Sequence, residues 1–217
     1  MERVDRLQNL YQRLWEVFGP QGWWPGDSPF EVAVGAILTQ NTNWHNVARV
    51  IAQLKQTEQL APLRLMEIGE AELAQILRPV GYYNLKARRL KNFLDFLFFY
   101  YQGSVENMAA ASLENLRPAL LSIKGIGPET ADSILLYALE KPTFVVDAYT
   151  FRICHRHDLV NDPCSYEDLR QLFMAQLPPE VQLFKEYHAL LVRLGKEFCR
   201  PKPRCELCPL FGQDFLK

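Results

Sequence analysis

The sequence lacks an excess of basic residues. It contains 24 lysines and arginines against 25 aspartates and glutamates, which gives a net charge of −1 and excludes a positively charged surface over the whole molecule. It also lacks a long apolar run, because residues 93–101 are too few to span a bilayer. We find no signal peptide either. We therefore expect a cytoplasmic protein that does not associate with a membrane.

The sequence also lacks the alternating apolar pattern of strands and shows helical spacing instead. Ser28, Pro29 and Glu31 form the start signal of a helix with a capping box. The apolar run 32–38 that follows indicates a helix buried on most sides. Since 48% of the residues are hydrophobic, a packed core is expected. These patterns predict an all-α fold.

A glycine-containing turn lies between two of the expected helices. The first helix should run from Pro118 to about Ser122, and Pro128 should open the second. Free N–H groups at the start of a helix bind anions. The pattern therefore predicts a helix-hairpin-helix that holds a phosphate, although it also fits an ordinary corner between two helices. The residues of this turn are Lys124, Gly125, Ile126, Gly127 and Thr130.

One carboxylate follows this turn, roughly twenty residues further along the chain. Asp147 comes after the apolar segment 144–146, at the expected start of another helix. Aspartate is favoured as a helix N-cap, and a fixed carboxylate can also serve in catalysis. Both roles are compatible, since capping would hold the side chain in place.

The cysteines are few, and three of them lie close together near the end. Cys199, Cys205 and Cys208 have the spacing C-x5-C-x2-C, which suits zinc or an iron–sulfur cluster. A fourth cysteine is missing, and Asp214 stands where it would be expected. A cluster with Asp214 or water as fourth ligand, a zinc site and a loop without metal all remain open. We expect Cys154 and Cys164 to be structural.

Two local groups of basic residues are candidate contacts for a polyanion, although each also fits the solvated face of a helix. The first group is Lys86, Arg88, Arg89 and Lys91, and the second is Arg193, Lys196, Arg200, Lys202 and Arg204.

The hairpin turn, Asp147 and the terminal cysteines, in this order, resemble the endonuclease III superfamily of DNA glycosylases. The resemblance covers nearly the whole chain. It implies two helical lobes with a DNA-binding cleft between them. One lobe would be a six-helix barrel over residues 28–141, and the other would combine residues 1–27 with 142–217. It also implies a monomer that binds double-stranded DNA with a damaged base.

The resemblance implies roles for particular residues. Asp147 would be the catalytic aspartate, Gln40 would fill the gap left by the flipped base, and the hairpin would bind the DNA backbone. The terminal cysteines would hold a 4Fe-4S cluster or its remnant. Members that also cut the strand carry a lysine where this chain has Glu129. Because a carboxylate cannot form an imine with the sugar, we expect base removal without lyase activity.

Several segments resemble the bacterial 3-methyladenine DNA glycosylase III branch in particular. These segments include residues 23–25, 38–42 and 81–87. In that branch, aromatic rings line the base pocket and would bind a cationic methylated purine. The implied pocket residues here are Trp23, Trp24, Pro25, Trp44 and Lys196.

Three alternatives remain at this point. The same fold would suit a glycosylase for oxidised pyrimidines or mismatched bases. The hairpin alone would suit a DNA-binding protein without catalysis. A small metalloprotein unrelated to DNA has only the cysteine loop in its favour.

Overall fold

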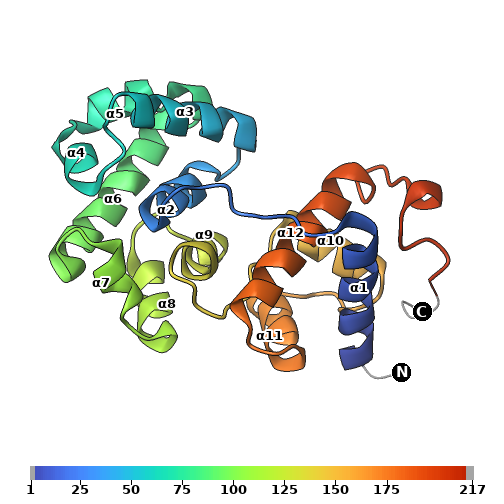
Figure 1. The fold of residues 1–217 in the computed structure, drawn as a ribbon. Helices are drawn as coiled ribbons and strands as arrows, with labels where there is room; N and C mark the ends of the chain where they lie inside the picture. The colour runs from blue at the N-terminus through green and yellow to red at the C-terminus, as the bar shows by residue number, and fades with distance from the viewer. Residues whose placement is uncertain (1–2, 214–217) are drawn as a thin grey trace. The chain divides into compact units, whose positions relative to one another are not determined.

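The computed structural model describes residues 3–213, and in this range it is helical with no strand (Figure 1). The α-helices are α1 (Arg3–Phe18), α2 (Pro29–Leu38), α3 (Trp44–Gln56), α4 (Pro62–Glu67), α5 (Glu70–Ile76), α6 (Tyr83–Tyr101), α7 (Val105–Ala109), α8 (Leu113–Ser122), α9 (Pro128–Ser133), α10 (Ala148–Arg156), α11 (Tyr166–Gln176) and α12 (Val181–Glu197). Three short turns of 3-10 or π helix are η1 (Arg78–Val80), η2 (Ile134–Ala138) and η3 (Cys205–Leu207). The predicted all-α fold is confirmed. No helix of the described range is long and apolar enough to cross a membrane.

The described chain divides into two compact units. The central unit runs from Pro25 to Lys141, and the terminal unit joins the residues up to Trp24 with those from Pro142 onward. Helix α2 lies inside the central unit, where it packs against α3, α6, α9 and η2. Its residues 30–38 are all buried, as the apolar run predicts. A helix surrounded on most sides leaves little room for polar groups, which explains its composition.

The start of α2 differs in one detail from the prediction. Ser28 is the N-cap, and its side chain accepts a hydrogen bond from the Glu31 backbone N–H. The Glu31 carboxylate does not complete a capping box with Ser28. It accepts from the backbone N–H of Asp27 instead and forms an ion pair with Lys55. The attraction of Lys55 explains why the carboxylate turns away from the cap.

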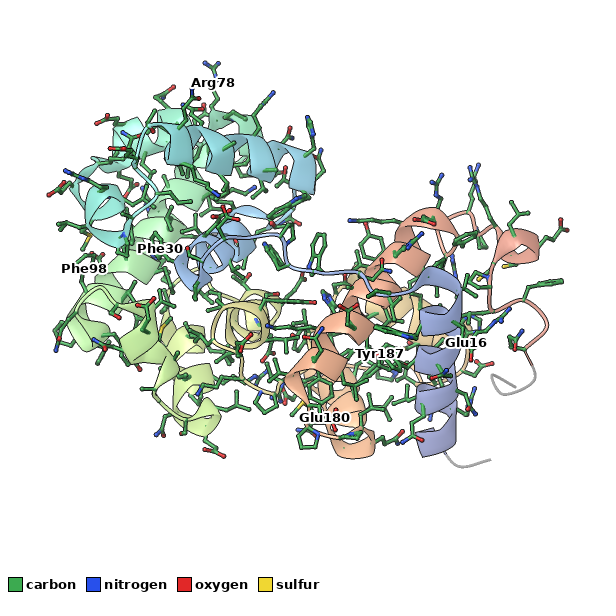
Figure 2. The ribbon with its side chains drawn as sticks, viewed as in Figure 1. Glu16, Phe30, Arg78, Phe98, Glu180 and Tyr187 are labelled. Carbon is green, nitrogen blue, oxygen red and sulfur yellow. The ribbon has the colours of Figure 1, made fainter. Side chains whose placement is uncertain are left out.

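Aromatic side chains form the core of the terminal unit. The rings of Phe144 and Phe173 stack with centroids 3.9 Å apart, and Phe184 meets Phe144 edge to face. Tyr187 of α12 is fully buried, and its hydroxyl donates to the Leu7 carbonyl of α1 (Figure 2). This bond satisfies the polar tip of an otherwise apolar group. The core therefore holds α12 in a fixed position against α1.

Helix α8 begins earlier than expected. Ser112 caps it by accepting from the Asn115 N–H, so the helix runs over Leu113–Ser122 with Pro118 in its interior. The expectation that Pro118 starts the helix is wrong. Proline removes one backbone hydrogen bond, and the side-chain cap and the buried Leu116 and Leu120 outweigh that loss.

Candidate active site and DNA-contacting residues

Asp147 is the N-cap of α10 in the terminal unit, as the sequence predicts. One carboxylate oxygen, Oδ1, accepts hydrogen bonds from the backbone N–H and the hydroxyl of Thr150, at 2.8 and 2.9 Å. Only 12% of the side chain is exposed. The cap therefore fixes the carboxylate through one oxygen and leaves the other, Oδ2, for a different partner.

That second oxygen faces His188 of α12. The distance from His188 Nε2 to Asp147 Oδ2 is 3.7 Å, and the histidine is buried. Burial raises the pKa of Asp147, but the nearby His188 and the hydrogen bonds from Thr150 more than offset this, so the pKa lies below its ordinary value. The carboxylate is therefore ionised at neutral pH. The sequence analysis missed His188, although a histidine inside an apolar helical stripe marks a buried polar group.

The two adjacent tryptophans also belong to the terminal unit. The ring centroids of Trp23 and Trp24 are 5.3 Å apart with the planes tilted by 60°, and both residues are half-buried. The ammonium of Lys196 lies 5.6 Å from the Trp23 ring centroid, within the range of a cation–π contact. The structure therefore brings together three of the five residues expected to line the base pocket.

A buried glutamate holds the loop that leads to the tryptophans. Glu186 of α12 accepts the backbone N–H of Gln21 at 2.7 Å and that of Gly22 at 3.3 Å, and it is 4% exposed. Charge-assisted bonds of this kind are strong. Glu186 therefore supports the tryptophan pair, and nothing in the local sequence pointed to this role.

Pro25 and Trp44, the other two expected pocket residues, belong to the central unit. Pro25 is exposed at the boundary of that unit, and Trp44 is the half-buried first residue of α3. Their place beside a base therefore stays a prediction.

The hairpin turn lies between α8 and α9, and its two glycines have different surroundings. Gly125 has φ +98°, and a Cβ there would come within 2.4 Å of the Arg89 side chain. Gly127 caps α9 with an extended backbone, and a Cβ there would meet nothing. The chain itself requires glycine at position 125 but not at 127. The open space at Gly127 is where a phosphate backbone could approach closely.

Gln40 is attached to this hairpin. Its Nε2 donates to the Thr130 hydroxyl at 2.8 Å and to the Gly125 carbonyl at 3.3 Å, while Arg89 donates to its Oε1. Thr130 is buried, whereas Lys124 is exposed. Gln40 thus has a structural role in the central unit, and its contact with DNA stays a prediction.

The first basic group does not form a surface patch. Lys86 is 1% exposed and donates to the Val80 carbonyl at 2.7 Å. Its burial, and to a smaller extent the charge of Arg89, lower its pKa to about 8. Lys91 donates to the carbonyls of Leu65 and Met66. Both lysines serve the fold, so neither interpretation of this group, a polyanion contact or a solvated face, applies to them.

The cysteine loop is attached to α10 by two arginines. The Arg156 guanidinium donates to the Cys199 sulfur at 3.3 Å, and Arg152 donates to the Cys199 carbonyl at 2.6 Å. Cys199, Cys205 and Cys208 line one cavity of about 510 Å³. Within residues 3–213, however, no three His, Cys, Asp or Glu side chains are arranged to hold a metal ion, and Asp214 lies outside the described residues. The described residues do not by themselves form a cluster site, so the 4Fe-4S cluster stays a prediction and we derive no chemistry from one.

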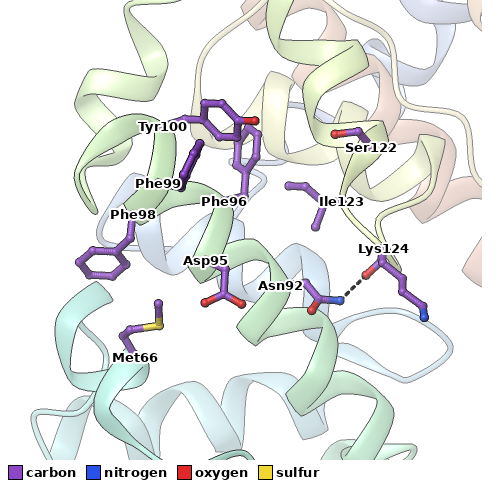
Figure 3. Close-up of a pocket in the computed structure, with 10 residues that line it drawn as sticks. All are labelled: Met66, Asn92, Asp95, Phe96, Phe98, Phe99, Tyr100, Ser122, Ile123 and Lys124. Atoms are coloured by element: carbon purple, nitrogen blue, oxygen red, sulfur yellow. Dashed lines mark hydrogen bonds between the residues drawn. The ribbon is translucent and has the colours of Figure 1, made fainter.

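A second hollow, of about 780 Å³, lies on the central unit beside Lys124 (Figure 3). Aromatic residues of α6, including the exposed Phe99 and Tyr100, line one side of it. The Asn92 amide donates to the Lys124 carbonyl at 2.8 Å at its edge. None of the expected base-pocket residues line this hollow.

Comparison with known proteins decides the family. Residues 34–179 match the model of the HhH-GPD superfamily of base excision DNA repair proteins. The chain belongs to this superfamily. It is 45% identical over 210 residues to a Methanocaldococcus jannaschii protein named as a candidate DNA repair glycosylase, covering 96% of this chain and 95% of the relative.

Two solved structures have the same fold. The H. pylori 3-methyladenine DNA glycosylase bound to 1,N6-ethenoadenine has a TM-score of 0.76 and 27% identity, covering 91% of this chain and 98% of that one. A non-covalent endonuclease III–DNA complex has a TM-score of 0.82 and 22% identity, covering 97% and 94%. The HhH-GPD chain described here is thus a base excision DNA glycosylase with an endonuclease III-like fold, as its motifs predict.

Proposed function

We propose that this HhH-GPD glycosylase is monofunctional: it flips an alkylated purine, 3-methyladenine first, out of duplex DNA and hydrolyses its N-glycosidic bond. The observation that carries the proposal is the ionised, buried carboxylate of Asp147 in the unit that also holds the tryptophan pair. The H. pylori relative, a 3-methyladenine glycosylase with a modified adenine bound, supports the choice of substrate.

Asp147 supplies the charge that the reaction needs. As the base leaves, positive charge develops on the sugar. A carboxylate held at that sugar stabilises the cation and can accept a proton from the attacking water. Oδ1 is already bonded to Thr150, so Oδ2 is the oxygen that acts.

The tryptophan pair supplies a surface for a cationic base. The ring of Trp23 already has the Lys196 ammonium near it, and two cations would repel one another on a single ring. Trp24 is therefore the ring on which the base stacks. A methylated purine is a good leaving group, so this chemistry does not need a general acid for the base.

Main-chain groups of the hairpin would position the DNA. The turn presents the exposed Lys124 and the open space at Gly127. Both suit a contact with a DNA phosphate that does not depend on the base sequence. Gln40, held by Thr130, would fill the gap left by the flipped nucleotide.

Release of free base from a panel of defined duplexes tests the substrate. Each duplex carries one 3-methyladenine, 1,N6-ethenoadenine, uracil, a thymine–guanine mismatch or thymine glycol. We expect the fastest release from 3-methyladenine. Release of uracil or thymine alone would favour the activity named for a Pyrobaculum aerophilum relative, a thymine/uracil-DNA glycosylase that is 25% identical over 95% of this chain.

Trp24→Ala should lower the release of 3-methyladenine by roughly 5- to 100-fold, because a stacked base is worth about 1–3 kcal/mol. Binding to an abasic-site duplex should change far less, since that duplex has no base to stack. Single-turnover release and fluorescence anisotropy give the two quantities. Trp23→Ala is the matched variant and should have the smaller effect on release. Equal losses of release and abasic-site binding for Trp24→Ala would mean that this ring only supports the fold.

Borohydride should trap no covalent adduct between the protein and an abasic-site duplex. Glu129 is exposed in the first turn of α9, and its carboxylate cannot form the imine that borohydride reduces. A bifunctional endonuclease III serves as the positive control on the same gel. A strong trapped band that persists in Lys124→Ala would reveal another reactive amine and contradict the monofunctional assignment.

A further inference from the structure

The two oxygens of Asp147 have different surroundings. Oδ1 is used by the helix cap through Thr150, whereas Oδ2 faces Nε2 of His188 at 3.7 Å. Only 12% of the aspartate and 6% of the histidine side chain are exposed. Water can therefore do little to hold the orientation of Oδ2, and the histidine is placed to do so.

We propose that His188 is a positioning residue: it donates a hydrogen bond from Nε2 to Asp147 Oδ2 and so keeps the carboxylate ionised and fixed in rotation. The inference rests on the proposed glycosylase function. It assigns to His188 no contact with substrate, since it acts through Asp147.

The separation of 3.7 Å is longer than a direct hydrogen bond. Hydrogen bonds in catalytic sites are often long without substrate and shorten in its complex. Substrate binding would also exclude water and strengthen the bond.

The backbone around His188 is firmly held, so the histidine has a defined place. Its neighbour Glu186 binds the backbone of residues 21 and 22, and its neighbour Tyr187 binds the Leu7 carbonyl. Further along α12, Gly195 lets α10 approach closely, because a Cβ there would lie 2.4 Å from the Tyr149 ring. The contact of Gly195 with Tyr149 sets the spacing between α10 and α12, and the other two contacts hold α12 itself.

Two buried groups on the same helices, Cys154 and Tyr187, remain neutral in acid. Burial raises the pKa of Cys154, on α10, and that of Tyr187, on α12. The Tyr166 hydroxyl of α11 accepts from the Val146 N–H at 3.4 Å. Because Glu186 is the same in the native protein and in His188→Leu, a difference between their activity profiles in the acid range reports on Asp147.

The sign of the expected pH effect follows from the surroundings of Asp147. Burial raises its pKa, and His188 and Thr150 lower it. Without the histidine, burial is opposed by Thr150 alone, so the pKa rises and the carboxylate is protonated at a higher pH. The acid limb of the activity profile, where activity falls as the pH is lowered, should then move to higher pH.

Two variants test whether His188 acts by donating a hydrogen bond or only by filling space. His188→Leu fills the space without a donor, and His188→Gln keeps an N–H near the Nε2 position. Single-turnover release from 3-methyladenine duplexes is measured from pH 5 to 8, with release in enzyme-free samples subtracted. Binding to an abasic-site duplex and the melting temperature show that each variant is folded.

We expect His188→Leu to be about 10- to 100-fold slower at neutral pH, as for loss of a hydrogen bond to a charged group. Its acid limb should move upward by about one pH unit. His188→Gln should stay within about threefold of the native rate, and its acid limb should move less than that of His188→Leu, because a neutral amide supplies the hydrogen bond but not the electrostatic attraction of His188.

Three results would overturn the inference: a His188→Leu rate equal to the native rate, a slower rate with an unmoved acid limb, or His188→Gln as impaired as His188→Leu. Failure of the proposed function looks different. In that case the native protein itself would release no base from any duplex, or Asp147→Asn would release it at the native rate.

Discussion

Asp147→Asn should abolish most base release while leaving the fold and the DNA affinity nearly unchanged. The asparagine oxygen can still accept the Thr150 N–H, and asparagine is as good a helix N-cap as aspartate. What is lost is the negative charge beside the sugar. A positioned acid–base group contributes about 10²- to 10⁴-fold, and we expect a loss of this order in the single-turnover rate.

The matched control is Asp162→Asn, which changes an exposed carboxylate of the same unit. It should alter neither release nor binding. Release by Asp147→Asn at the native rate would mean that another group stabilises the cation. Loss of both DNA binding and thermal stability would mean that Asp147 acts only as a helix cap.

The local signals in the sequence predicted several helix ends, among them the start of α10 at Asp147. Asp147 caps α10 through Thr150, and Ser165 caps α11 while the Asp168 carboxylate accepts the Ser165 N–H in return. Each cap depends on residues three positions apart. Such contacts can be read from the sequence because both partners lie on one turn of helix. Pro118 failed as a start signal because a better cap, Ser112, lies six residues before it.

Glu186 and His188 could not be predicted from local signals in the sequence. Glu186 binds a backbone N–H that is 165 positions away, and His188 meets Asp147 only because α10 and α12 pack together. The sequence marks both as polar residues in an apolar stripe, but it does not name their partners. The position of Lys86 could not be predicted either, because successive residues of a helix point to different sides, so that Lys86 is buried and Arg88 is exposed.

Asp132→Ala should destabilise the central unit by about 3–5 kcal/mol, the usual cost of leaving one member of a buried ion pair alone. Arg117 of α8 forms two bonds with Asp132 of α9, at 2.9 and 3.0 Å. The aspartate side chain is fully buried and the arginine is 17% exposed. The pair joins the two helices of the hairpin, so its loss should also weaken DNA binding.

Chemical denaturation gives the free energy of unfolding, and Glu67→Ala is the control. Glu67 pairs with Arg64, but both side chains are more than half exposed, and such a pair is worth about 0–1 kcal/mol. The double variant Arg117→Leu with Asp132→Leu should recover much of the lost stability, because it leaves no unpaired charge buried. Equal losses for Asp132→Ala and Glu67→Ala would contradict a special role for the buried pair.

The same three variants separate stability from function in the hairpin. If the ion pair acts only by joining α8 and α9, the double leucine variant should regain DNA affinity together with stability. If it regains stability but not affinity, the orientation of the two helices matters beyond their mere attachment. In that case the planar, two-bond geometry of arginine and aspartate would fix the angle at which the turn from Lys124 to Gly127 meets the DNA backbone.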